Sequence, residues 1–288
     1  MMPVDGHLRR IEREAGMPGL AEALTKLAPT DLQSLLLHVF REQAARRDPR
    51  ALLAQYERDS SVAAGRDVHA LETRAFAAAA AFEPVALAPV SPLGLNGVLG
   101  GIGQNNVAST IRMTEVLADP TAALALEAAV RRRANPGETV RLCAACRVLR
   151  LQPVPPGPGF TQHFSLFALV TAGRAQPSHG FEIEALREHV AIYRSLLAEF
   201  NPEVRLTDVP GRVLAAIDGA VEDRERTRAR GYYAGALLEI GVTDREGRDL
   251  GIVDGGMTDW TQRLLANRKE RLFTSGIGLG LLAQRCSV

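Results

Sequence analysis

One arginine and one histidine lie beside apolar, strand-like sequence, where a charged side chain requires a partner. Arg150 is near the end of the apolar run of residues 140–151, and His163 is near the start of the run of residues 160–172. Because side chains alternate between the faces of a strand, Arg150 shares a face with apolar neighbours, and its charge needs an anion there. A guanidinium suits a phosphate or a carboxylate. The sequence therefore predicts an anion-binding site at Arg150; the structural alternative is an arginine that caps an ordinary hairpin, with a core histidine beside it.

Two strands are expected to position these side chains. The segment that joins the two apolar runs, residues 152–159, contains four prolines and two glycines. Proline cannot donate to a strand ladder, so this segment is a loop. The two runs are therefore predicted to pair as an antiparallel hairpin with a protruding loop.

The remaining elements of the core are predicted from periodicity and capping residues. Apolar positions recur at helical spacing in four segments, residues 68–81, 122–133, 181–200 and 211–228. Alternation predicts strands over residues 107–116 and 204–209, and the glycine-rich segment 94–103 predicts a hairpin. Asp119 is a good N-cap for the second helix, with proline in its first turn. The charged run of residues 222–228 is interpreted as a solvated helix face.

Composition, charge and cysteine usage exclude several classes of protein. The 288 residues carry a formal net charge of +1 and no long basic run, which argues against a strong nucleic-acid or membrane field. Three cysteines, no apolar N-terminal segment and no apolar run of about 18 residues predict a soluble, cytoplasmic protein without a membrane partner. Cys143 and Cys146 face opposite sides of a strand and no second Cys/His pair follows, so structural cysteines are favoured over a metal site.

Residues 1–66 are expected to form a helical N-terminal region, and residues 67–288 the core. Apolar residues recur at helical spacing through residues 5–58, with prolines at the breaks. Two interpretations of this region remain open. It is either an accessory module that contacts a protein partner, or a set of helices packed on the main domain.

The hairpin sequence resembles motif 2 of class II aminoacyl-tRNA synthetases. The matching residues are Leu149-Arg150-Leu151-Gln152, then a loop, then His163-Phe164-Ser165-Leu166-Phe167. The resemblance implies that Arg150 holds the α-phosphate of ATP, and that His163 and Phe167 embrace the γ-phosphate and adenine. Gln152 stands where that class usually has glutamate.

Two later segments resemble histidyl-tRNA synthetases. Residues 228–240, Arg-Ala-Arg-Gly-Tyr-Tyr-Ala-Gly-Ala-Leu-Leu-Glu-Ile, are similar to the signature Arg-Gly-Leu-Asp-Tyr-Tyr-x-Gly-x-x-Phe-Glu. This implies that Arg228 acts on the substrate during adenylation, and that Tyr232 and Tyr233 bind substrate. Residues 254–259, Asp-Gly-Gly-Met-Thr-Asp, are similar to Gly-Gly-Gly-Arg-Tyr-Asp and keep its final Asp259 as a further substrate-binding residue.

Two more segments extend the likeness at either end. Residues 112–115, Arg-Met-Thr-Glu, are similar to the Arg-Pro-Glu-x-Thr segment that binds the substrate α-amino group, so Arg112 and Glu115 are expected to bind substrate. A salt-bridged structural glutamate is the alternative. Residues 275–282 resemble motif 3, whose γ-phosphate arginine would fall at Ala283. Arg285 lies two residues on, about 200° around a helix, and would face elsewhere.

The resemblance implies an α+β fold, an antiparallel sheet of about six strands flanked by helices, over residues 67–288. The helix of residues 68–81 and the extended residues 82–92 are similar to motif 1, the dimer interface in that class, which implies a homodimer. No anticodon-binding domain is expected, so we do not expect the chain to charge tRNA.

Three functions follow from this resemblance and remain open. The first is a ligase that uses ATP and Mg²⁺ to adenylate an amino acid or related small carboxylate for a non-tRNA acceptor. The second is a non-catalytic protein that resembles the regulatory subunit of ATP phosphoribosyltransferase and binds an amino-acid-like ligand. The third is a structural protein with a vestigial pocket.

Overall fold

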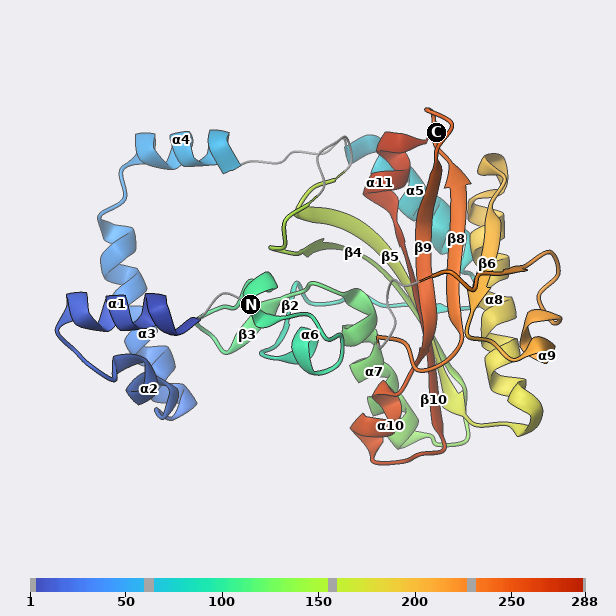
Figure 1. Ribbon diagram of the computed structural model, residues 1–288, viewed down its shortest axis with the longest axis horizontal. Coiled ribbons are helices and arrows are strands. Elements are labelled where there is room, and N and C mark those ends of the chain that lie inside the picture. Colours follow the sequence, from blue (N-terminus) through green and yellow to red (C-terminus); the bar gives the residue numbers. More distant parts are fainter. Residues whose placement is uncertain (1–3, 60–64, 155–159, 227–231, 287–288) are drawn as a thin grey trace. The chain divides into compact units, whose positions relative to one another are not determined.

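The computed structural model describes residues 4–59, 65–154, 160–226 and 232–286 (Figure 1). The chain forms two compact units, one of Met1–Ser60 with Thr110–Thr114, the other of Ser61–Ser109 with Glu115–Val288. No helix in the described ranges is long and apolar enough to cross a membrane.

The first unit consists mainly of helices. Its helices are α1 (Val4–Ala15), α2 (Leu20–Thr25), α3 (Pro29–Ala45) and α4 (Pro49–Asp59). Pro29 occupies the first turn of α3, where its missing N–H costs nothing. None of the residues of this unit whose burial is described is buried, so the unit has no core of its own.

The second unit is built on an eight-stranded sheet in the order β1-β4-β5-β10-β9-β8-β6-β7. Its strands are β1 (Glu83–Pro84), β4 (Val140–Leu149), β5 (His163–Arg174), β6 (Glu203–Thr207), β7 (Val221–Glu222), β8 (Leu237–Thr243), β9 (Asp249–Thr258) and β10 (Glu270–Gly278). The six central strands pair antiparallel, and only the two-residue edge strands β1 and β7 pair parallel to a neighbour. The predicted α+β fold with an antiparallel sheet is confirmed. A separate two-stranded sheet joins β2 (Val90–Pro92) and β3 (Thr114–Val116).

The predicted hairpin is the pair β4 and β5. Its register runs from Val140 opposite Ala172 to Leu149 opposite His163. Along β5, side chains with odd numbers, such as Phe167, join one core layer, and those with even numbers, such as Ala168, join the other. Both faces of this hairpin are therefore covered, which explains its continuous apolar sequence.

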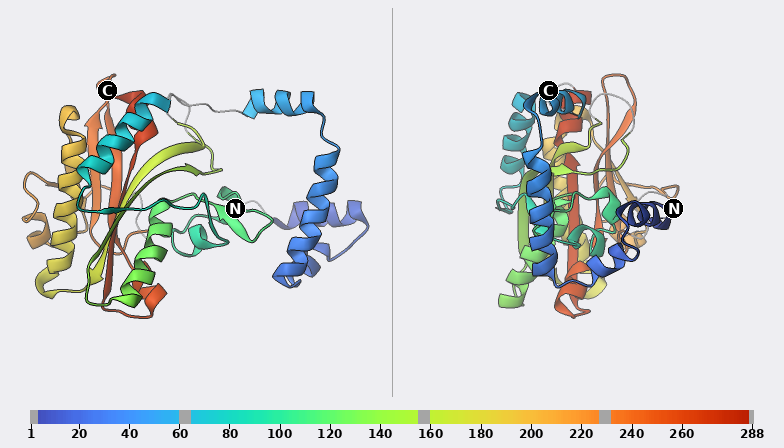
Figure 2. Two further views of the ribbon diagram at one scale, coloured as in Figure 1. Left: turned by 180° about the vertical axis from the view of Figure 1, so that it is seen from behind. Right: turned by 90° about the vertical axis from the view of Figure 1, so that its left-hand side faces the viewer.

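Helices α5 (Gly65–Ala78), α8 (Gly180–Leu196) and α11 (Leu279–Arg285) cover one face of the sheet (Figure 2). A polar group lies inside this layer: His189 is fully buried, with Nδ1 2.6 Å from Ser275 Oγ and Nε2 3.0 Å from Thr171 Oγ1. Burial, with a smaller contribution from Arg141, lowers the pKa of His189 to about 3. The imidazole is therefore neutral in the folded protein.

Helices α6 (Leu95–Val98), α7 (Pro120–Ala134) and α10 (Trp260–Leu265) lie on the opposite face. Asp119 caps α7 as predicted, because its Oδ1 accepts a 2.9 Å hydrogen bond from Thr121 N. Near the other end of α7, the buried Arg132 donates from Nε and Nη2 to both carboxylate oxygens of Glu270, at 2.9 and 3.0 Å. The helix is thus tied to β10 by a buried, bidentate ion pair.

Three expected elements differ from those observed. A helix is predicted over residues 211–228, but its described part, residues 211–226, contains the short helix α9 (Gly211–Leu214) and the edge strand β7 instead. The glycine-rich segment 94–103 contains the short helix α6 and not a hairpin. Residues 107–116 are not one strand, because the chain turns between Ser109 and Glu115, which form an antiparallel bridge.

Candidate functional site

A cavity of about 450 Å³ opens on the sheet face that carries α7. The N-terminus of α7, the end of β4 and the facing parts of β5, β8, β9 and β10 line it, together with two tyrosines. The lining residues are Gly100, Ile102, Asp119, Pro120, Thr121, Arg150, Leu166, Arg226, Tyr232, Tyr233, Glu239, Gly251, Ile252, Val253, Asp254, Gly276 and Gly278. The volume lies within the usual range for small-molecule sites. The lining combines apolar surface with three acidic side chains and two arginines.

Arg150 forms one wall of the cavity, one residue beyond the end of β4. Its Nε donates a 2.8 Å hydrogen bond to the carbonyl oxygen of Ala118, and its guanidinium carbon lies 5.4 Å from the centre of the Phe164 ring. Nη2 is 3.9 Å from Asp119 Oδ2, which is an ion contact and not a hydrogen bond. Within the described residues the two terminal nitrogens make no shorter polar contact, so they are available to an anion.

Asp119 joins the arginine to the tyrosine wall. Its Oδ1 accepts hydrogen bonds from Thr121 N and Thr121 Oγ1, at 2.9 and 2.7 Å, and its Oδ2 accepts a 2.7 Å bond from the Tyr232 hydroxyl. Burial and the Asp119 carboxylate raise the pKa of Tyr232 well above its ordinary value. Tyr232 therefore stays protonated and serves as a donor to a charged acceptor.

Tyr233 packs edge-on against Tyr232, with ring centres 4.7 Å apart. A Cβ added at Gly256 would lie 2.7 Å from the Tyr233 ring and 2.7 Å from the carbonyl oxygen of Ala236. Any larger residue at position 256 would clash with the ring, so Gly256 provides the space in which Tyr233 packs. Burial and Asp254 raise the pKa of Tyr233 as well.

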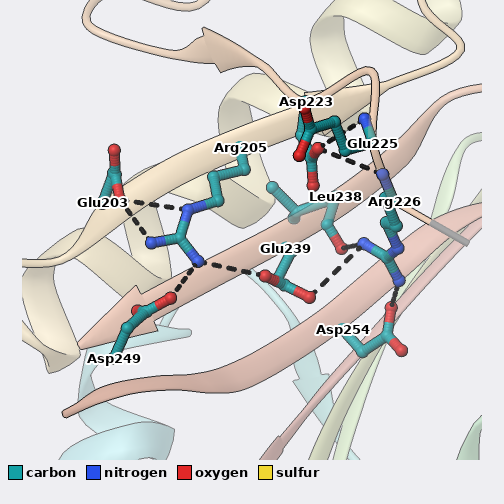
Figure 3. A network of polar contacts seen from close by, with 9 residues as sticks. All are labelled: Glu203, Arg205, Asp223, Glu225, Arg226, Leu238, Glu239, Asp249 and Asp254. Atoms are coloured by element: carbon teal, nitrogen blue, oxygen red, sulfur yellow. Dashed lines mark hydrogen bonds and ion pairs between the residues drawn. The ribbon is translucent and has the colours of Figure 1, made fainter. Parts of the chain in front are cut away.

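The floor of the cavity is a network of charges on β8 and β9 (Figure 3). Arg226 has a side chain only 4% exposed, and it donates 2.6 Å from Nη2 to Asp254 Oδ1 and 3.3 Å from Nη1 to the carbonyl oxygen of Leu238. The same Nη1 lies 4.0 Å from Glu239 Oε2. Figure 3 shows the Arg226 guanidinium between these two carboxylates.

Solved structures share this architecture, although sequence comparisons find no match. The sequence matches no protein-family model and no curated protein sequence. Many solved structures match, and the following three are similar at TM-scores above 0.5 and low sequence identity. The apo S. aureus histidyl-tRNA synthetase is 16% identical, with 75% of this chain and 64% of that chain covered and a TM-score of 0.55.

An ATP phosphoribosyltransferase regulatory subunit/histidyl-tRNA synthetase from Bacillus halodurans is 11% identical, with 75% of this chain and 77% of that chain covered and a TM-score of 0.56. A histidine–tRNA ligase subunit from Alicyclobacillus acidocaldarius is 12% identical, with coverages of 81% and 94% and a TM-score of 0.58. The chain has a class II aminoacyl-tRNA synthetase-like fold. It spans 64% of the S. aureus enzyme, and at these identities the likeness concerns the fold alone.

The synthetase-like fold brings three of the predicted site residues together. Arg150, Tyr232 and Tyr233 all line the cavity. Arg228 lies outside the described residues. His163 is at the start of β5, with Nδ1 2.6 Å from Arg147 Nη2, and it is not among the described residues that line the cavity.

Phe167 does not lie where the likeness to motif 2 implies. Its side chain is completely buried in the layer under α5, edge-on to Phe76 with ring centres 5.2 Å apart. Odd-numbered side chains of β5 point away from the cavity, and even-numbered Leu166 lines it. The aromatic ring next to Arg150 is Phe164, three residues before Phe167 in the sequence. The assignment of Phe167 to the site from the sequence is therefore corrected.

Glu115 is a structural residue rather than a substrate ligand. It is completely buried, and its carboxylate accepts hydrogen bonds from the backbone N–H groups of Gly94 and Asn96 and from the side chains of Asn96 and Gln104. Burial raises the pKa of Glu115, but these hydrogen bonds outweigh it, so the pKa is lower than usual. The carboxylate organises the segment around α6.

Arg112 and Asp259 also lie outside the cavity lining. Arg112 is exposed in the turn between Thr110 and Thr114. Asp259 precedes α10, is half exposed, and lies 3.7 Å from Arg263. Neither is among the described residues that border the cavity.

The end of the motif 3-like segment is apolar where that class has an arginine. Ala283 is buried in the layer under α5. As expected from its position on the helix, Arg285 points elsewhere: its Nη2 lies 3.5 Å from Asp244 Oδ2.

Four residues of the site escaped the sequence analysis as ligand-facing groups: Asp119, Arg226, Glu239 and Asp254. Asp119 was identified only as a helix cap, and Arg226 was placed on a solvated helix face. Glu239 and Asp254 are inside the quoted motifs, and Asp254 occupies a position where histidyl enzymes have glycine. That departure from the motif was the one available signal.

Proposed function

We propose that the chain binds a free amino acid or a related small carboxylate in this cavity and acts as a non-catalytic binding or regulatory protein. The observation that carries the proposal is the Arg150 guanidinium, held by Ala118 and Phe164 with its terminal nitrogens available in a cavity of ligand size. A planar guanidinium fixed along one edge can receive a carboxylate on the other.

The arrangement around the nucleotide side supports binding over catalysis. Ala283 stands where motif 3 has its arginine, Arg285 contacts Asp244, and Phe167 is in the core. Phosphoryl chemistry depends on charge neutralisation by positioned cations. Among the described residues, Arg150 is the only cation of the predicted ATP-binding set on the cavity wall.

Adenylation of the bound carboxylate is the second candidate, because the fixed Arg150 suits an α-phosphate as well as a carboxylate. Arg150 is the described residue that would hold ATP. No group of three or more metal-ligating side chains occurs in the described ranges, so the carboxylates that could hold a nucleotide-bound Mg²⁺ are Glu239 and Asp254.

The test compares Arg150→Ala with Arg147→Ala, a surface arginine outside the cavity. An amino acid that binds only the folded state stabilises it by an amount that rises with the logarithm of its concentration over Kd, so thermal unfolding without ATP reports binding. Loss of hydrogen bonds to a charged group, about 1.5–3 kcal/mol, predicts roughly a 10- to 150-fold weaker Kd for Arg150→Ala. Arg147→Ala should bind as the wild type does.

Pyrophosphate exchange separates the two candidates. Amino-acid-dependent exchange between pyrophosphate and ATP would establish adenylation and refute the non-catalytic proposal. Stabilisation by an amino acid without exchange supports it. If no amino acid or small carboxylate stabilises the protein, both candidates are wrong.

We further propose a homodimer, with residues 1–66 as a contact for a protein partner. The helical unit supports the second point, because none of its residues whose burial is described is buried and it exposes apolar side chains such as Leu35, Val39 and Phe40. Light scattering with and without residues 1–66 tests the oligomeric state: a dimer is expected in both cases.

A further inference from the structure

The charged residues on the cavity floor form one row across the sheet. Arg205, Glu239, Asp254 and Gly276 stand directly opposite one another on β6, β8, β9 and β10. Glu239 and Asp254 both line the cavity. Like charges at directly opposite positions repel each other, so nearby cations stabilise this pair of carboxylates.

The cations of the described residues do not balance this network. Arg226 makes a close contact with Asp254, at 2.6 Å, and a loose one with Glu239, at 4.0 Å. Arg205 lies 3.2 Å from Glu239, but it is shared with Glu203 and Asp249 (Figure 3). In the described part of the chain, four carboxylates thus share two guanidinium groups.

One oxygen of each cavity carboxylate accepts no hydrogen bond from the described residues. Glu239 Oε1 and Asp254 Oδ1 take the arginine hydrogen bonds, and within the described residues Glu239 Oε2 and Asp254 Oδ2 accept none. The neighbouring lining positions are glycines. A Cβ at Gly276 would meet nothing closer than the carbonyl oxygen of Phe167 at 3.6 Å, and a Cβ at Gly251 would press on the Glu239 carboxylate at 3.2 Å. The space beside both carboxylates is therefore kept clear of side chains.

The net charge of the cavity lining determines which charge on a ligand is favoured. Among its described lining residues, Asp119, Glu239 and Asp254 are negative, whereas Arg150 and Arg226 are positive. A second carboxylate on the ligand would meet this excess of negative charge, whereas a cation would complete the network.

We propose that the cavity selects an amino acid whose side chain ends in a positive charge, with its carboxylate on Arg150 and its terminal cation on Glu239 and Asp254. The proposal rests on the function proposed above and adds the ligand class. Its chemistry covers guanidino and amino side chains.

Arginine and citrulline provide the test, because they have nearly the same shape and differ in the charge of the side-chain end. Titration calorimetry on the full chain at pH 7.5 should give a Kd for L-arginine or L-lysine at least tenfold lower than for L-citrulline or L-norleucine. Equal affinities for charged and neutral ligands, or tighter binding of L-histidine, would overturn the ligand class and leave the binding function intact. If none of these amino acids binds, the binding function fails as well.

Matched variants locate the selectivity. Glu239→Gln keeps the shape of the side chain and should bring the ratio of the citrulline to the arginine Kd close to one. Asp249→Asn, in the same network but outside the cavity, should leave that ratio unchanged. Asp254→Asn is the second variant, should Glu239→Gln not fold. A ratio that stays above tenfold in both cavity variants contradicts the assignment of Glu239 and Asp254.

Discussion

Replacing Tyr232 with phenylalanine tests whether the Asp119 carboxylate organises the cavity wall. The hydroxyl donates a 2.7 Å hydrogen bond to Asp119 Oδ2, and the nearest cation to that oxygen among the described residues, Arg150, is 3.9 Å away. A hydrogen bond to a charged group contributes about 1.5–3 kcal/mol. We therefore expect Tyr232→Phe to lower the free energy of unfolding by about 2 kcal/mol, measured by urea denaturation.

Tyr193→Phe is the matched control for this change. Tyr193 is completely buried, and its hydroxyl lies 2.9 Å from the neutral Ser275 Oγ. A neutral hydrogen bond contributes about 0.5–1.5 kcal/mol, so the loss should be smaller. Our reasoning is refuted if Tyr193→Phe costs as much as Tyr232→Phe.

The same variant has a consequence for binding. Without the tyrosine hydroxyl, Arg150 is the one partner that the described residues leave to Asp119 Oδ2, and the guanidinium is drawn toward it. An arginine engaged by an internal carboxylate binds an external one less well. The Kd for the bound amino acid should rise several-fold; an unchanged Kd would mean that Asp119 and Arg150 act independently.

Two further changes test the cavity and the core. Gly276→Val should leave folding intact, because Gly276 has an ordinary strand backbone and the nearest atom to an added Cβ is 3.6 Å away. The valine side chain would fill the space of the ligand, so calorimetry should detect no binding. An unchanged affinity would place the ligand elsewhere. His189 has a pKa lowered to about 3, against an ordinary value near 6.5, so below about pH 6.5 only the unfolded chain takes up the proton and stability falls as the pH drops toward 3. The loss in urea midpoint between pH 7 and pH 5 should shrink in His189→Asn, and an equal loss in both proteins would assign the pH dependence to other groups.

The sequence was sufficient for the hairpin and for the cap of α7 because both depend on local patterns. Apolar alternation and a proline-rich loop specify β4 and β5, and Asp119-Pro120 specifies a helix start whatever surrounds it. The placement of Arg150 on the cavity wall followed from the same hairpin.

The sequence could not predict the roles of residues whose partners lie far away along the chain. Arg226 can be buried because its guanidinium donates hydrogen bonds to Asp254, 28 residues further along the chain, and to the carbonyl oxygen of Leu238. Nothing in the run Asp-Arg-Glu-Arg indicates these partners. Glu115 similarly depends on amides about 20 residues earlier in the chain. Tertiary contacts of this kind override local propensity, which also explains the helix wrongly predicted over residues 211–228.

Helix α7 is held at both ends, by the contacts of Asp119 with Tyr232 at its start and by the ion pair of Arg132 with Glu270 near its end. A helix anchored in this way cannot swing toward or away from the sheet when the cavity fills. The distance between the Arg150 wall and the acidic floor then stays constant when the cavity fills, so guanidino and amino side chains of different length should bind with different affinity.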